Sequence, residues 1–218
     1  MPARYGLYYA PAADDPLWQA GTAWLGRDPE TDTPRQQPDL PDMPAITAEA
    51  ANYGFHATLK PPMALRPGFT RDDVLAATES VAATIPPFAL PSLAVTDLSG
   101  FLALCETTPS AALQAAADAC VAGLDHLRAP PTDAELARRR RHGALPPAQE
   151  ANLQRWGYIY VFATWQFHMT LTRRLTAEEK PLYRPAAETF FAAALSQPRR
   201  VTALCLITQS ETGAHFVL

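Results

Sequence analysis

The sequence predicts an α+β protein with two antiparallel-rich lobes related by a pseudo-twofold axis. Segments rich in aromatic and β-branched residues alternate with segments of helical periodicity. The pentapeptide FHATL at residues 55–59 returns as FHMTL at residues 167–171, which is 112 positions later from histidine to histidine (168 − 56). Each copy precedes a predicted helix and then predicted strands. This order indicates a weak internal duplication.

The first half is expected to contain a strand, a helix, a strand, a helix and two short strands. The strands are predicted in residues 4–10, 53–60 (stopped by Pro61 and Pro62), 88–98 and 101–107, the last two joined by Ser99-Gly100. Leucine, alanine and tryptophan recur at helical spacing in residues 14–28, and Thr70 is a candidate N-cap for a helix over 70–85. Residues 28–47 are rich in proline and lack periodicity, so we expect a long loop there.

The second half is expected to repeat this order. Ser110 is a candidate N-cap for a helix over residues 110–127, and a polar segment follows over residues 128–149. The remaining elements are a helix at 147–156, one or two strands within 158–172, a helix within 176–196 interrupted or delayed by Pro181 and Pro185, and a closing hairpin of 200–210 with 214–218.

Length and composition limit the class of protein. With 218 residues, 48% of them hydrophobic, we expect one two-lobed catalytic domain over residues 1–218, with halves near 1–106 and 107–218 and exchange of strands between them left open. A net charge of −4 argues against a surface built for long nucleic acid. Three widely spaced cysteines, no membrane-length apolar run and no signal-type start predict a monomer in the cytoplasm, without membrane contact.

The two repeated strands each place a histidine beside a threonine. Successive side chains of a strand point to opposite faces, so His56 and Thr58 share one face, as do His168 and Thr170. The apolar residues of each pentapeptide share the other face and are expected in the core. Two polar faces of this kind are the candidate active site.

Two histidines suit acid–base chemistry at phosphorus. Histidine titrates near pH ~6.5, so a neutral ring can take a proton from water while a charged ring protonates the leaving oxygen. Each such role contributes roughly 10²–10⁴-fold to the rate. The hydroxyls of Thr58 and Thr170 can donate to the non-bridging phosphate oxygens, where charge develops. The scheme requires no metal and no cofactor.

These residues also carry a family resemblance. The chain resembles the 2H phosphoesterase superfamily, which has two H-x-[ST] motifs, and more closely its bacterial DUF1045 group, which is linked by name to phosphonate metabolism. The matching stretches are YGFHATLKPP, WGYIYVFATWQFHMTLT, RYGLYYAP, PLWQAGTAWLGRD, FALPSLAVTDLSGFLAL and ELARRRR. One departure is Asn52, where this resemblance leads us to expect a basic residue.

The resemblance implies a fold as well as an activity. The fold has two lobes, with two antiparallel sheets and flanking helices around a central cleft. The activity is metal-independent hydrolysis of a phosphodiester, commonly a 2′,3′-cyclic phosphate. By position, His56 and His168 would be the acid–base pair, and Thr58 and Thr170 would bind phosphate.

Several residues near the motifs have two possible roles each. Lys60 can neutralise phosphate or lie exposed at a strand end, and Thr172 adds a hydroxyl that either meets substrate or does not. Tyr53 and Tyr158 can stack on a base or ribose, or pack in the core. The run Arg138–Arg141 is by base rate a solvated face, with closure over the cleft as the alternative.

The function predicted from the sequence is therefore hydrolysis of a cyclic nucleotide or a ribosyl cyclic phosphate. Which histidine is acid and which is base stays open. Metal catalysis is a rival hypothesis, but neither motif has a second ligand at metal-binding spacing. A binding or processing module for RNA ends or nucleotides, with no small-molecule hydrolysis, is the alternative function.

Overall fold

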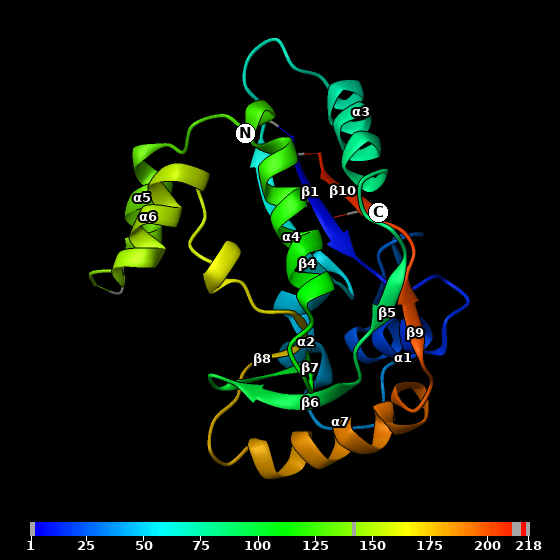
Figure 1. The fold of residues 1–218 in the computed structure, drawn as a ribbon. Coiled ribbons are helices and arrows are strands. Elements are labelled where there is room, and N and C mark those ends of the chain that lie inside the picture. The colour runs from blue at the N-terminus through cyan, green and yellow to red at the C-terminus, as the bar shows by residue number, and fades with distance from the viewer. Residues whose placement is uncertain (1–2, 141–142, 211–214, 217–218) are drawn as a thin grey trace.

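The computed structural model describes residues 3–140, 143–210 and 215–216 (Figure 1). Its strands are β1 (Arg4–Tyr9), β2 (Arg27–Asp28), β3 (Thr33–Pro34), β4 (Ala57–Ala64), β5 (Phe88–Leu90), β6 (Leu93–Leu98), β7 (Phe101–Glu106), β8 (His168–Arg174), β9 (Arg199–Val201) and β10 (Cys205–Gln209). Its helices are α1 (Pro16–Leu25), α2 (Met43–Tyr53), α3 (Arg71–Ala82), α4 (Ala111–Leu124), α5 (Asp133–Arg140), α6 (Pro147–Trp156) and α7 (Lys180–Leu195), with short 3₁₀ turns η1 (Asp125–Leu127) and η2 (Phe162–Thr164). The protein is a mixed α+β structure, as predicted.

One antiparallel sheet of six strands, in the order β10-β1-β4-β8-β7-β6, organises the fold. Two sheets were predicted. The structure instead joins two three-stranded halves through one pair of opposed residues, Ala57 of β4 and Met169 of β8. Both side chains are fully buried, so the junction lies against the core. The repeated motifs are therefore neighbours at the centre of the sheet.

The order of elements repeats along the chain. With β2, β3, α2, α5 and α6 set aside, the succession β1, α1, β4, α3, β5, β6 is followed by β7, α4, β8, α7, β9, β10, and the change falls at the Ser99–Gly100 turn. The second strand after α3, β6, pairs with β7, while the second strand after α7, β10, pairs with β1. Each half-sheet thus takes its outer strand from the other succession. The division into lobes 1–106 and 107–218 stays a prediction.

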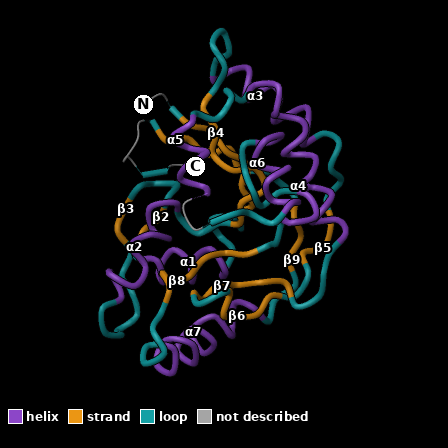
Figure 2. The backbone as a smooth tube through the Cα atoms, turned by 90° about the vertical axis from the view of Figure 1, so that its left-hand side faces the viewer, coloured by secondary structure: helices purple, strands orange, loops and turns teal. Residues whose placement is uncertain are grey.

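Helices pack on both faces of the sheet. In Figure 1, α4 runs in front of β4, which it contacts, and α7 runs along the end of the molecule near β6. Figure 2 shows α1 and α2 beside β8, and both contact that strand. The indole of Trp24 in α1 donates a hydrogen bond to the Leu171 carbonyl at 3.0 Å, which ties α1 to the second motif. Within the described ranges, no helix is both long and apolar enough to cross a bilayer.

The predicted helix caps are confirmed. The Thr70 side chain accepts from the Asp73 N–H at the start of α3, and Asp73 in return accepts from the Thr70 N–H. The Ser110 side chain accepts from the Leu113 N–H at the start of α4. Such caps satisfy backbone donors that have no partner within the helix.

Two helices were not predicted. α2 begins inside the expected loop of residues 28–47, with no side-chain cap and with a proline in its first turn. Its buried face is only Met43, Ile46, Thr47 and Ala50, so its periodicity was weak. α5 has no buried residue at all among its eight, so the sequence offered no apolar pattern to detect.

Three strand predictions were also wrong in part. β4 continues through Pro61 and Pro62. On one side its pairing with β1 is irregular opposite Gly6, and on the other side β8 pairs with β4 only at Ala57. The N–H groups that the prolines lack are therefore not needed for a ladder hydrogen bond. Residues 158–166 form a loop with η2, held by the Thr164 hydroxyl, instead of a strand. The expected strand at 200–210 is instead two strands, β9 and β10, which pair with β5 and β1. Of the expected partner strand, residues 215 and 216 are in no strand, and 214, 217 and 218 lie outside the described residues, as do the turn residues 211–213.

Candidate functional site

The site is built on one face of β4 and β8. Since Ala57 lies opposite Met169 and both are buried, the alternating neighbours His56, Thr58, His168 and Thr170 project to the other face. All four are half-buried. The charge of His168 acts on His56, so the two rings lie within electrostatic reach of each other. The two motifs thus form one polar patch with pseudo-twofold symmetry.

Phenylalanines fix each motif from behind. Phe55 is fully buried, stacks on Phe191 of α7 at 6.2 Å between ring centroids, and lies against Gly21 of α1. Phe167 is likewise buried, with the rings of Tyr9 and Trp165 around it. Each histidine therefore follows a residue that cannot move without disturbing the core.

The two imidazoles are held in the same way. Nδ1 of His56 lies 2.8 Å from the Gly54 carbonyl, and Nδ1 of His168 lies 2.9 Å from the Gln166 carbonyl. In each case the carbonyl belongs to the residue two positions earlier. A carbonyl can only accept, so Nδ1 carries the hydrogen in both rings and Nε2 is left to exchange a proton.

His56 has the more enclosed ring. Tyr8 of β1 stacks on it at 3.6 Å between centroids and 13° between planes, and the Thr58 hydroxyl lies 3.1 Å from its Nε2. Burial, with a smaller contribution from the positive charge of His168, lowers the pKa of His56 to about 4 against the opposing effect of the bond to Gly54. The neutral form of His56 is favoured at neutral pH.

His168 lies on the other side of the junction. The ring of Phe101 meets it edge-on at 6.1 Å, and Cys105 of β7 is its cross-strand neighbour. Burial lowers the pKa of His168, and the bond to the Gln166 carbonyl opposes this. The pKa of His56 is the one lowered far, so the state in which His168 carries the proton and His56 is neutral is favoured as the pH falls.

The two predicted tyrosines lie near the His56 side of the patch. Tyr53 is 40% exposed, with its ring 6.4 Å from His56 and stacked on Phe216 at 4.8 Å. Tyr158 is half-buried directly after α6, and Arg139 of α5 lies over its ring at 4.4 Å. Both are in positions where they could contact a substrate bound at His56.

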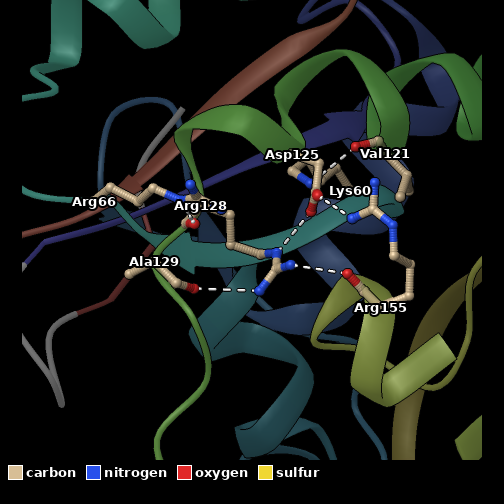
Figure 3. Close-up of polar contacts among 7 residues, drawn as sticks. All are labelled: Lys60, Arg66, Val121, Asp125, Arg128, Ala129 and Arg155. Carbon is tan, nitrogen blue, oxygen red and sulfur yellow. Dashed lines mark hydrogen bonds and ion pairs between the residues drawn. The ribbon is translucent and has the colours of Figure 1, made fainter. Parts of the chain in front are cut away.

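Lys60 shares the strand face of His56 but is covered. It is 2% exposed, and its Nζ donates to the Val121 carbonyl of α4 at 3.2 Å (Figure 3). Burial lowers the pKa of Lys60 to about 8, opposed by the nearby Asp125 carboxylate. The exposed strand-end lysine considered from the sequence is therefore not what the structure has, and substrate contact by Lys60 stays a prediction that would require it to leave Val121.

Thr172 has a structural hydrogen bond. It is 1% exposed, and its hydroxyl accepts from the Leu102 N–H of β7 at 2.9 Å. The bond connects β8 to β7 where their register is irregular. The position gives no support to the predicted contact between Thr172 and a substrate.

A cluster around Asp125 attaches α6 to the end of α4. The Asp125 carboxylate accepts from Arg128 at 2.8 Å and from Arg155 of α6 at 2.7 Å (Figure 3). These arginines hold the pKa of Asp125 below its ordinary value against the effect of burial. The cluster sets the position of α6 and hence of Tyr158.

Tyr8 and Arg139 are site residues that the sequence did not single out. Tyr5 and Tyr8 are three positions apart in β1 and so point to opposite faces, which leaves the sequence unable to say which of them faces the site, and Arg139 is one of four arginines in a row. Arg141 of that run and His142 lie outside the described residues. Arg139 differs from the neighbouring arginines only in its tertiary contacts, which the sequence does not show.

Other features of the surface lie away from the histidines. Two hollows of about 390 and 560 Å³ are lined around Trp24 with Phe190 and around Trp18 with Arg199, and neither contains a motif residue. In the described part of the chain no three His, Cys, Asp or Glu side chains gather as a metal-binding group. The site is therefore defined by its chemistry and by the junction of β4 with β8.

Comparison with known proteins gives the family. A model described as "Protein of unknown function (DUF1045)" matches residues 58–217, which is 160 of 218 residues (217 − 58 + 1). The chain is 42% identical to "Ribose 1,5-bisphosphate phosphokinase PhnN" of Janthinobacterium sp. (strain Marseille), over 98% of this chain and 49% of that protein. It is 37% identical to the protein of the same name from Laribacter hongkongensis (strain HLHK9), over 99% and 50%. The chain thus spans about half the length of these curated relatives, and it belongs to the DUF1045 family.

Proposed function

We propose that this protein hydrolyses a cyclic phosphodiester on a ribose by two-histidine acid–base catalysis without a metal. The observation that carries the proposal is the arrangement of His56 and His168. They project from adjacent strands on one face, and each has Nδ1 bound to a backbone carbonyl, which leaves Nε2 to act. Two such nitrogens on either side of a phosphorus atom suit in-line attack by water.

The environments of the two rings support different roles. His56, with its pKa lowered to about 4, is neutral and would accept a proton from the attacking water. His168, which protonates first, would donate a proton to the departing ribose oxygen. Water adds to phosphorus as its proton passes to His56, and one P–O bond of the ring breaks as His168 gives a proton to the departing oxygen. The product is a phosphomonoester beside a free hydroxyl.

The two threonines would hold the phosphate. Thr58 and Thr170 lie on the same face as the histidines, and both are half-buried. Their hydroxyls could donate to the non-bridging oxygens, where negative charge increases in the transition state. Thr58 already contacts Nε2 of His56, so it would have to turn its hydrogen toward substrate.

The name of the relatives favours a ribosyl cyclic phosphate as the substrate class. Those proteins are named for ribose 1,5-bisphosphate, a ribose with two phosphates. Opening a 1,2-cyclic phosphate on a ribose 5-phosphate by breaking the bond to O2 leaves ribose 1,5-bisphosphate. We propose that this half of the longer relatives supplies that compound, and that the role in phosphonate metabolism suggested by the resemblance follows from it.

We do not carry the phosphokinase activity to this chain. No glycine of the sequence is followed by lysine, so the G-x-x-x-x-G-K-[ST] loop that cradles nucleotide phosphates in many kinases does not occur. Hydrolysis of a cyclic phosphate would place the chain immediately before such a kinase. Binding of RNA ends or nucleotides without hydrolysis is the alternative that the experiment must separate.

The test is a substrate screen by phosphorus NMR. Purified protein is mixed with 2′,3′-cyclic AMP or with ribose 1,2-cyclic phosphate, with and without EDTA, beside the His56→Asn, His168→Asn double variant. We expect a new phosphomonoester resonance from at least one substrate, unchanged by EDTA and absent with the double variant. Loss of activity with EDTA contradicts the metal-free mechanism, and binding of intact substrate with no turnover favours the binding module.

A further inference from the structure

Arg139 differs from its neighbours in α5. Arg138 is exposed, and Arg140 forms an ion pair with Glu150 of α6. Arg139 is half-buried, lies over the Tyr158 ring at 4.4 Å, and makes no ion pair with a carboxylate anywhere in the described ranges. Burial raises the pKa of Tyr158, and the charge of Arg139 together with a hydrogen bond from it opposes this. A guanidinium has five N–H donors, so others remain for an anion.

Tyr158 holds this guanidinium at a fixed place. α6 ends at Gly157 in the left-handed region, with φ of 71°, and the chain turns there toward the site. Arg155, two residues earlier, is tied to Asp125, and its carbonyl accepts from Arg128 at 3.1 Å (Figure 3). The end of α6 is therefore fixed on α4, and Arg139 is positioned through it.

Contacts between rings connect this position to His56. Tyr8 stacks on His56, and the ring of Tyr53 lies 6.4 Å from it. Burial raises the pKa of Tyr8, and the charges of Tyr53 and Tyr158 raise it further, so the three phenol groups lie near one another. Arg139 is thus connected through Tyr158 to a tyrosine cluster, Tyr8, Tyr53 and Tyr158, that contacts His56.

Arg4 is a second cation near this tyrosine cluster. Its guanidinium lies 5.4 Å from the centre of the Phe216 ring, which stacks on Tyr53, and its Nε donates to Oε1 of Gln209 at 2.8 Å. The charge of Arg4 lowers the pKa of Glu135, yet the two make no ion pair within the described residues. Among the residues that the structure describes, no carboxylate forms an ion pair with Arg4.

The arginines on the His168 side have different contacts. Arg173 binds Glu179 through both of its terminal nitrogens, and Arg174 donates to the Ser99 carbonyl. Among the described residues Arg174 thus also has no carboxylate partner, but it is exposed and held at a carbonyl, whereas Arg139 is half-buried over a tyrosine ring.

We propose that Arg139, assisted by Arg4, forms a subsite for the second, non-reacting phosphate of a ribosyl cyclic phosphate. The inference rests on the proposed function, which places the reacting phosphate at the histidines. It makes Arg139 a specificity residue that selects substrates with a phosphate at the far end of the ribose. A bidentate guanidinium suits a terminal phosphate better than a lysine would.

The experiment compares two substrates and three variants. Adenosine 2′,3′-cyclic phosphate is used with and without a 5′-phosphate, and the readout is the ratio of kcat/KM for the two. We expect the 5′-phosphate to raise kcat/KM at least about tenfold in the unmodified protein, and Arg139→Gln to remove most of this preference. Arg139→Lys should restore part of it, and Arg138→Gln, the matched control on the exposed face of α5, should keep it.

A binding measurement separates this inference from the proposed function. If no cyclic phosphate is turned over, binding of ribose 5-phosphate is measured by calorimetry, with circular dichroism to verify that each variant is folded. A Kd weakened about tenfold or more by Arg139→Gln but not by Arg138→Gln supports the subsite. An equal ratio of kcat/KM or an equal Kd in the two folded variants overturns it, whether or not the protein is a hydrolase.

Discussion

At the scale of single residues, His56 and His168 share a backbone anchor but differ in what surrounds the ring. His56 is covered by Tyr8 and meets Thr58, whereas His168 has an aromatic edge and a cysteine beside it. The repeated sequence therefore produces similar positions with different protonation. This difference supports the proposed roles of His56 as base and His168 as acid.

The pH dependence of activity follows from these two pKa values. The base must be unprotonated, so kcat/KM should fall as the pH drops toward about 4, the pKa of His56. The acid must be protonated, so kcat/KM should fall again as the pH rises through the pKa of His168, which burial places below its ordinary value near ~6.5. The maximum of kcat/KM should lie below pH 7.

The measurement is a profile of kcat/KM with a cyclic nucleotide that lacks a second phosphate, because such a diester keeps one charge over this range. Activity that increases steadily from pH 6 to pH 9 would contradict the assignment of His168 as a protonated acid.

The sequence was sufficient to locate the histidines and threonines but not their surroundings. Strand alternation alone places His56 with Thr58 and His168 with Thr170, and the structure brings both pairs to one face. It could not choose between Tyr5 and Tyr8, nor recognise Arg139, because those contacts join segments far apart in the chain. Lys60 and Thr172 have the predicted strand positions, but α4 and β7 cover them.

At the scale of elements, the contact between α1 and the first motif supports the site. Gly21 of α1 faces the ring of Phe55, and a Cβ added at Gly21 would lie 2.2 Å from that ring. Phe55 is fully buried and immediately precedes His56. The helix can therefore approach the strand only because residue 21 has no side chain.

The substitution Gly21→Ala should reverse the usual effect of alanine in a helix. Alanine for glycine in a helix ordinarily stabilises by about 1 kcal/mol, whereas overpacking in a core costs roughly 1–3 kcal/mol. We expect a net loss of stability in urea unfolding, together with lower kcat/KM because Phe55 would displace His56. Gln19→Ala, on the exposed face of α1, is the control and should change stability by less than about 0.5 kcal/mol. A Gly21→Ala protein that is more stable than the unmodified one would refute this contact.

Elements were predictable where local chemistry determines them. The caps at Thr70 and Ser110 marked α3 and α4, and aromatic runs marked β1 and β7. α2 and α5 carry weak or no apolar periodicity, so packing and tertiary contacts decide them instead. β4 continues past two prolines because its neighbours require no hydrogen bond there, which only the sheet order reveals.

At the scale of the whole molecule, exchange of β6 and β10 ties the two halves together. Each half-sheet contains a strand that follows a helix of the other succession, and one buried cluster includes residues from β1 to β9. Two separate lobes with a loose interface would not share strands in this way.

The chain should therefore unfold in one cooperative step. Tryptophan fluorescence reports on Trp18 and Trp24 in the first succession and on Trp156 and Trp165 in the second, and circular dichroism reports on all helices. We expect the urea transitions from both probes to coincide. Two separated transitions would show that the halves fold as independent units.

The most direct test of the account is the activity of single and double histidine variants on one cyclic phosphate in the presence of EDTA. If His56 and His168 act in the same step, His56→Asn and His168→Asn should each lower kcat/KM by roughly 10²–10⁴-fold, and the double variant should lose little more than the worse single variant. Full activity in either folded single variant would contradict two-histidine catalysis.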